Sequence, residues 1–193
     1  ERACVIPAGT EMVVTPCTLD WDSLSEEQQR HHARRMEVYA GMVDAMDMHI
    51  GRLMAYLESI GEYDNTVFVF TSDNGAEGSN LILPDGGSVL KPWFDAVGYN
   101  SDYETLGDPN SWNAIGPSNA TVAASPLAYY IFHANEGGLR VPLVMSGPGI
   151  NRQGEMTDAF VFVTDLMPTL LSLTEMDDHG GQWQGRNVEP IIG

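Results

Sequence analysis

One short stretch of the chain carries residue types that suit metal chemistry. Residues 66–80, TVFVFTSDNGAEGSN, run from an apolar segment directly into Asp73, Asn74 and Gly75. Carboxylate and amide oxygens are hard donors of the kind that Ca²⁺ and Mg²⁺ bind. In open α/β sheets ligands gather outside the carboxyl ends of the strands, where these side chains would lie. Asp-Asn-Gly alone is mostly a turn signal. Two interpretations therefore stay open: an ordinary turn, or one half of a metal site.

A long helix and a strand are predicted to position these residues. Ser25 followed by acids suits a helix start, and Gly61 suits its end. Between them one apolar stripe recurs at spacings of three and four, which predicts a helix lying on a flat surface: Met36, Tyr39, Val43, Met46, Ile50, Leu53, Leu57 and Ile60. The run VFVFTS is apolar at consecutive positions and predicts a strand buried on both faces, as central parallel strands are.

The second half of the chain alternates irregular and regular patterns. Residues 76–135 are rich in Gly, Pro, Asn and Asp but contain aromatic residues, which indicates an ordered excursion with short helices. Residues 139–145 predict a second strand, with Pro142 favouring an edge position or a bulge. The run FVTDLMPTLLSLTEM predicts a helix with Thr164 as its N-cap. Helices alternating with strands indicate an α/β fold.

Charge and composition limit the partners. The chain has 193 residues with 27 acids against 9 Lys and Arg, a formal net charge of −18. Such a charge argues against nucleic acid or an anionic membrane as a partner. No apolar run approaches the roughly 18 residues that predict a membrane span. Cys4 and Cys17 are the only cysteines, and whether they pair stays open.

Three blocks of sequence resemble one known family. MEVYAGMVDAMDMHIGRLMAYLESIGEYDNTVFVFTSDNGAEG, ANEGGLRVPLVMSGPGI and TDLMPTLLSLT together resemble the sulfatase family, the arylsulfatase branch of the alkaline-phosphatase-like hydrolases, and cover most of residues 22–175. The resemblance implies a three-layer α/β/α sheet that is incomplete because its N-terminal strands are missing. It divides this partial catalytic domain, residues 1–193, into segments 1–20, 21–75, 76–135 and 136–193.

The resemblance also implies a site and an activity. Asp73 and Asn74 match the family's pair of Ca²⁺ ligands at this strand end. The family's nucleophile is a formylglycine made from Cys or Ser in a Cys-x-Pro-x-Arg-like motif, and neither Cys4 nor Cys17 fits that motif. The resemblance therefore implies part of a longer enzyme that hydrolyses aryl sulfates or sulfated carbohydrates, with the nucleophile in a missing N-terminal part. Alone, this chain is expected to be inactive; the family and the acidic composition favour a periplasmic or secreted protein.

One position departs from the family pattern. The family usually has a Lys five residues before the Glu of Glu-Gly-Gly, and counting back from Glu136 gives Ile131. An apolar side chain cannot stabilise developing negative charge. His133 is the candidate substitute, although a lone His is more often a packing or surface residue. Lys91, the only lysine, is a weaker candidate because it lies far from this motif in the sequence.

Two other functions remain open. A phosphate-ester hydrolase or phosphotransferase of the same superfamily would share the strand-end Asp, but it would usually add His ligands nearby, and SDNGAEGSN contains no His. A catalytically dead, acidic calcium-binding relative would explain Ile131.

Overall fold

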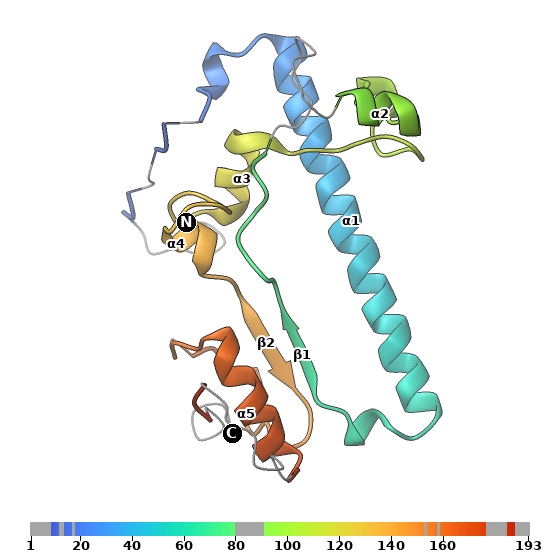
Figure 1. The fold of residues 1–193 in the computed structure, drawn as a ribbon, viewed down its shortest axis with the longest axis vertical. Helices are drawn as coiled ribbons and strands as arrows, with labels where there is room; N and C mark the ends of the chain where they lie inside the picture. Colours follow the sequence, from blue (N-terminus) through green and yellow to red (C-terminus); the bar gives the residue numbers. More distant parts are fainter. Residues whose placement is uncertain are drawn as a thin grey trace. The chain divides into compact units, whose positions relative to one another are not determined.

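The structure is a computed structural model that describes residues 9–11, 14–16, 18–79, 91–152, 154–157, 159–176 and 185–187. Cys4, Cys17 and the side chain of Lys91 lie outside the described residues. The elements follow one another along the chain (Figure 1) as η1 Trp21–Ser23, α1 Glu26–Ser59, η2 Tyr63–Asn65, β1 Phe68–Thr71, α2 Lys91–Val97, η3 Tyr103–Thr105, α3 Gly116–Ala124, α4 Glu136–Leu139, β2 Leu143–Ser146 and α5 Val163–Leu173. None of the described helices combines the length and hydropathy that a bilayer crossing requires.

The long helix α1 has the predicted ends. The backbone N–H of Ser25 donates to Gln28 Oε1 at 2.9 Å, and the N–H of Gln28 donates to Ser25 Oγ at 3.3 Å, which is a capping box. At the other end Gly61 adopts a φ of +76°, and the N–H of Glu62 donates to the carbonyl of Leu57 at 2.9 Å. Glycine reaches this left-handed conformation without a Cβ clash, so it ends the helix.

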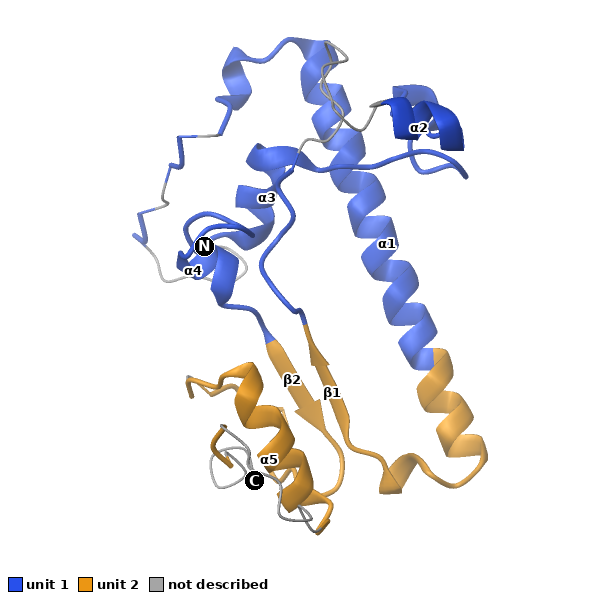
Figure 2. Ribbon diagram, in the orientation of Figure 1, with its two compact units in different colours: residues 1–51, 72–142 blue, residues 52–71, 143–193 orange. Residues whose placement is uncertain are grey.

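Two compact units divide the chain (Figure 2): residues 1–51 with 72–142, and residues 52–71 with 143–193. In the first unit a hydrophobic cluster forms from Ile115, Ala120 and Tyr130. Met36 and Tyr39 of α1 pack against this cluster, so this part of the predicted stripe does enter a core.

Farther along α1 the side chains of the apolar stripe are exposed to solvent. Val43, Met46, Leu53 and Ile60 are 43%, 44%, 53% and 51% exposed. The prediction that the whole stripe lies on a flat surface is therefore wrong for these positions in the described structure. Periodicity identifies which face of a helix is apolar, but it does not identify what covers that face.

The described strands form one antiparallel pair. β1 pairs with β2 in a register that runs from Phe68 opposite Ser146 to Thr71 opposite Leu143. The prediction of a parallel strand buried on both faces is wrong for β1, since its pairing with β2 is antiparallel and Phe70 is 43% exposed. A short apolar run carries no signal of strand direction. The three-layer arrangement stays a prediction.

The second strand begins later than predicted. Residues 136–139 form the short helix α4 instead, closed by a hydrogen bond from the N–H of Arg140 to the carbonyl of Glu136 at 2.8 Å. The strand then starts just after Pro142, which has no N–H to donate to a ladder.

The excursion is ordered where it is described. Within residues 91–124 it contains α2, η3 and α3, as predicted. Four rings gather around α2 with centroids 5.0–6.1 Å apart: Trp93, Phe94, Tyr99 and Trp112. Burying aromatic rings against one another is a large source of stabilisation in a segment with little regular structure.

Candidate functional site

Two glycine-containing motifs meet backbone to backbone in the first unit. The N–H of Gly75 donates to the carbonyl of Gly138 at 3.0 Å. A Cβ on Gly75 would overlap the carbonyl oxygen of Gly137. No residue with a side chain fits here without displacing main-chain atoms, so the Asp73-Asn74-Gly75 turn lies directly on α4.

The loop before α4 wraps around its glycines. The N–H of Gly137 donates to the carbonyl of Ala128 at 2.8 Å, and a Cβ on Gly137 would overlap the carbonyl of Tyr129. A Cβ on Gly138 would likewise overlap the carbonyl of His133. The Glu-Gly-Gly glycines thus allow close packing of main chains and do more than turn the chain into its strand.

Asp73 and Asn74 lie at the surface beside the backbone contact between Gly75 and Gly138, which we call the joint. Asp73 is exposed and Asn74 is half-buried. Ser72 Oγ donates to the carbonyl of Asn74 at 2.8 Å, and Asn74 Nδ2 donates to the carbonyl of Gly75 at 3.1 Å. Oδ1 is the Asn74 side-chain atom suited to a cation, because the amide nitrogen is a hydrogen-bond donor without a free lone pair.

The donor pair fits a hard cation in type but not in number. Ca²⁺ takes six to eight oxygen ligands. Among the described residues no group of three or more His, Cys, Asp or Glu side chains is placed to hold a metal ion. Asp73 and Asn74 can therefore supply part of such a site and need further ligands.

The position expected to carry a lysine is apolar and packed. Ile131 lies against the cluster of Ile115, Ala120 and Tyr130, and its N–H donates to the carbonyl of Ala76 at 3.0 Å. The Ile131 side chain is thus part of the packing of the loop.

His133 is held within the same loop. Its Nδ1 lies 3.2 Å from the carbonyl oxygen of Ile131 and 3.3 Å from that of Tyr130, so Nδ1 carries the proton and donates. The imidazole packs at 4.8 Å from the Tyr129 ring and at 4.9 Å from the Tyr130 ring. These contacts give His133 a packing role, while a catalytic role stays a prediction.

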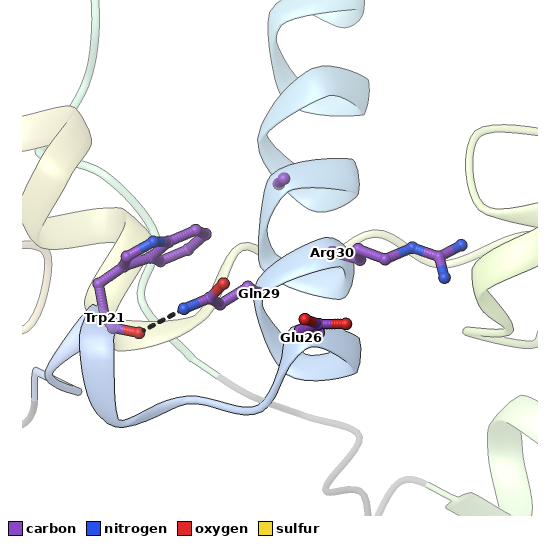
Figure 3. Close-up of a pocket in the computed structure, with 5 residues that line it drawn as sticks. Trp21, Glu26, Gln29 and Arg30 are labelled. Carbon is purple, nitrogen blue, oxygen red and sulfur yellow. Dashed lines mark hydrogen bonds between the residues drawn. The ribbon is translucent and has the colours of Figure 1, made fainter.

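A surface depression at the start of α1 lies apart from these residues. Trp21, Glu26, Gln29, Arg30 and Ala33 line it, and Gln29 Nε2 donates to the Trp21 carbonyl at 2.8 Å (Figure 3). The Arg30 guanidinium lies 5.1 Å from the centre of the Tyr103 ring, and the hydrogen bond that it donates to the Tyr103 side chain raises the pKa of Arg30. None of the residues predicted for the site lines this depression. Its positively charged side chain, Arg30, already packs on Tyr103 within the fold.

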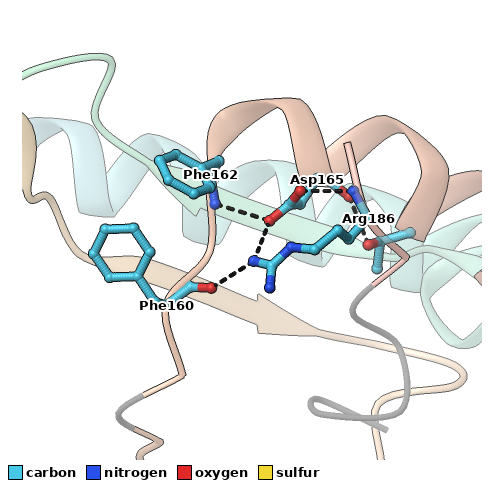
Figure 4. Close-up of polar contacts among 5 residues, drawn as sticks. Phe160, Phe162, Asp165 and Arg186 are labelled. Atoms are coloured by element: carbon cyan, nitrogen blue, oxygen red, sulfur yellow. Dashed lines mark hydrogen bonds and ion pairs between the residues drawn. The ribbon is translucent and has the colours of Figure 1, made fainter. Parts of the chain in front are cut away.

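In the second unit a buried carboxylate organises the start of α5 (Figure 4). Asp165 is 2% exposed and accepts hydrogen bonds from the N–H of Phe162 at 3.0 Å, the N–H of Arg186 at 2.7 Å and the Arg186 guanidinium at 2.9 Å. The backbone hydrogen bond from Arg186 is the largest cause that lowers the pKa of Asp165 to about 2. The predicted N-cap Thr164 is wrong, because α5 begins at Val163 with Phe162 as its cap.

Sequence reasoning missed the Asp165–Arg186 contact. Arg186 lies beyond the end of α5, in a stretch without periodicity, so no local pattern pairs the two residues. One local signal was available: Asp165 lies three residues after the cap Phe162, which is the acidic position of a capping box.

Comparison with known proteins identifies the family. The sulfatase family model matches residues 14–176. The chain belongs to the sulfatase family. It is 40% identical over 185 residues to an uncharacterized sulfatase of Schizosaccharomyces pombe, and this similarity covers 95% of the chain and 32% of the relative.

Two further relatives carry more specific names. The sulfatase chain is 33% identical over 175 residues to an arylsulfatase of Klebsiella aerogenes, which covers 90% of the chain and 36% of that protein. It is 58% identical over 60 residues to an N-acetylglucosamine-6-O-sulfatase of Bacteroides thetaiotaomicron, which covers 31% of the chain and 9% of that protein. The chain thus spans about a third of the length of the first two relatives.

Proposed function

We propose that this chain is part of a longer sulfatase that hydrolyses sulfate esters and that Asp73 and Asn74 are two of the ligands of its Ca²⁺ ion. The backbone joint between Gly75 and Gly138 carries the proposal, because it holds the main chain of the turn that bears both oxygen-containing side chains against a packed loop. Membership of the sulfatase family supports the reaction class. The chain spans only about a third of the length of two relatives, which supports the proposal that it is part of a longer protein.

The chain's own residues have binding roles in this proposal. Asp73 contributes a negatively charged oxygen, and Asn74 contributes Oδ1 while its nitrogen stays on the Gly75 carbonyl. Ser72 holds the Asn74 carbonyl and so limits movement of the turn. When bound, Ca²⁺ would supply Lewis-acid stabilisation of the negative charge on the ester oxygens. The remaining ligands and the formylglycine nucleophile belong to other parts of the protein.

The proposed substrates are aryl sulfates or sulfated carbohydrates. Names of the relatives support both classes, since one is called an arylsulfatase and another an N-acetylglucosamine-6-O-sulfatase. The acidic composition and the family favour a periplasmic or secreted location.

Calcium titration of the full-length protein tests the ligand assignment. Asp73→Asn removes one charge from the proposed site and is expected to weaken Ca²⁺ binding at least about 10–100-fold, the range seen when even an outer partner of a metal site is lost. Asp47→Asn is the matched control, because Asp47 is exposed on α1 and outside the proposed ligand set. Equal affinity in the two variants, measured by calorimetry, would remove Asp73 from the site.

A second candidate function is calcium binding without catalysis. Ile131 favours it, because the side chain at the expected lysine position packs against the hydrophobic cluster. A full-length protein that binds Ca²⁺, carries an unmodified Cys or Ser at the nucleophile position and turns over no sulfate ester would establish this candidate. Turnover of an aryl sulfate would exclude it.

A further inference from the structure

Two aromatic residues of the loop before α4 have left-handed backbone conformations. Tyr129 has a φ of +66° and Phe132 a φ of +72°. For a bulky residue with a Cβ this region is a true outlier. Such strain persists only where the surrounding structure imposes it, and strained residues cluster at sites that bind ligands.

The surrounding hydrogen bonds impose this conformation. On one side of Phe132 the N–H of Ile131 donates to the carbonyl of Ala76 at 3.0 Å. On the other side the N–H of His133 donates to the carbonyl of Tyr130 at 3.3 Å, and His133 Nδ1 donates to the same turn. Phe132 is therefore clamped between two fixed neighbours.

The aromatic rings of this loop differ in how deeply they are buried. Tyr130 is 7% exposed in the hydrophobic cluster, and its ring and that of Tyr129 pack on His133. Phe132 is 80% exposed, and among the described residues its ring makes no contact with another ring. At this exposure, burial gives the phenyl group little stabilisation to offset its backbone strain. Packing among the described residues therefore does not explain an aromatic side chain at this position.

The exposed ring belongs to a loop that is hydrogen-bonded to the residues just after the proposed calcium ligands. Phe132 follows Ile131, which is hydrogen-bonded to Ala76, and Ala76 lies two residues after Asn74. The hydrogen bond between Gly75 and Gly138 joins the same two segments a second time. The phenyl ring is thus carried by a segment that is fixed relative to Asp73 and Asn74.

From this placement we infer that Phe132 is a specificity residue that contacts the aromatic leaving group of a sulfate ester held at Asp73 and Asn74. The inference rests on the proposed function and narrows its substrate class to aryl esters. Offset stacking between two aromatic rings is favourable beyond the area it buries. A rigid backbone under the ring lowers the entropy lost when the complex forms.

Binding of a non-hydrolysable aryl sulfonate to the full-length protein tests the inference. The probe is naphthalene-2-sulfonate and the comparison ligand is methanesulfonate, which has the same anionic head without a ring. Phe132→Gly is expected to weaken naphthalene-2-sulfonate binding about tenfold and to leave methanesulfonate unchanged, while Phe132→Tyr keeps the wild-type affinity.

The glycine variant separates loss of the ring from loss of the fold. Glycine adopts a positive φ without strain, so Phe132→Gly is expected to keep or raise Tm. Unchanged affinity for naphthalene-2-sulfonate in a folded Phe132→Gly protein overturns the inference, as does a wild-type protein that binds neither probe.

Turnover separates this inference from the proposed function. A wild-type protein that binds the aryl sulfonate through Phe132 but hydrolyses no sulfate ester supports the ring contact and defeats the proposed activity. A protein that hydrolyses 4-nitrophenyl sulfate with a kcat/KM that Phe132→Gly leaves unchanged keeps the activity and defeats the inference.

Discussion

The N–H of Gly75 and the carbonyl of Gly138 are joined by a 3.0 Å hydrogen bond, and the main chains around them are too close for a Cβ. This contact connects the Asp-Asn-Gly turn to the Glu-Gly-Gly helix, two motifs that lie far apart in the sequence. Each motif alone is compatible with an ordinary turn. Their contact makes them one structural unit on which the proposed site depends.

Gly75→Ala is expected to destabilise the protein by about 1–3 kcal/mol, because the added methyl group overlaps the Gly137 carbonyl and main chain must move. Chemical denaturation of the full-length protein measures this change. Gly51→Ala is the control, since α1 leaves open space at Gly51 and alanine is expected to stabilise a helix interior by about 0.5–1 kcal/mol. If Gly75→Ala stabilised the protein as the control does, the close contact would be wrong.

Ile131→Lys is expected to lower stability by about 1–3 kcal/mol rather than to restore a catalytic cation. The half-buried Ile131 side chain packs against the hydrophobic cluster, and a lysine must either bury its charge or leave that contact. Ile131→Met is the matched variant, since it keeps the side chain apolar and of similar volume. A lysine variant that is as stable as the methionine variant and faster on an aryl sulfate would show that this position faces the substrate.

The second unit is expected to lose stability in acid as the Asp165 carboxylate becomes protonated. The pKa of this carboxyl is about 2 in the folded protein against an ordinary value of 3.8. Its contribution is therefore fully present above the unfolded value and is lost as the pH falls toward 2. Asp165→Asn should lower the free energy of unfolding at pH 6 and flatten its pH dependence between pH 4 and 2.

The Arg186 side chain should contribute less to this dependence than its backbone. Arg186→Met removes the guanidinium but keeps the N–H that donates to Asp165 at 2.7 Å, which is the largest cause of the low pKa. Urea titrations at several pH values are expected to place Arg186→Met between the wild type and Asp165→Asn. A pH dependence in Asp165→Asn identical to that of the wild type would contradict the assignment.

The sequence predicted α1 almost completely because its signals are local. Ser25 and Gly61 lie at its ends, and the spacing of Met36 and Tyr39 identified the face that meets the cluster. Helix periodicity and caps depend on residues within a few positions of one another.

Long-range features were harder to predict. The antiparallel direction of β1 depends on β2, which comes much later in the chain, and nothing in the run VFVFTS encodes that direction. The closeness of Gly75 to Gly137 likewise depends on tertiary packing. The resemblance to sulfatases drew attention to Asp73 and Asn74, but only the structure connects them to the loop that bears Phe132.

The joint between the Asp-Asn-Gly turn and α4 is made of main-chain atoms, and this separates the architecture of the region from its chemistry. Carbonyl and amide groups are the same in every residue, so substitutions at neighbouring side chains such as Ile131 and Phe132 leave the joint's hydrogen bonds available. A protein built this way can exchange the side chains around the turn while the turn keeps its place. The glycines set the position of the backbone in this region, and the side chains around them set its chemistry.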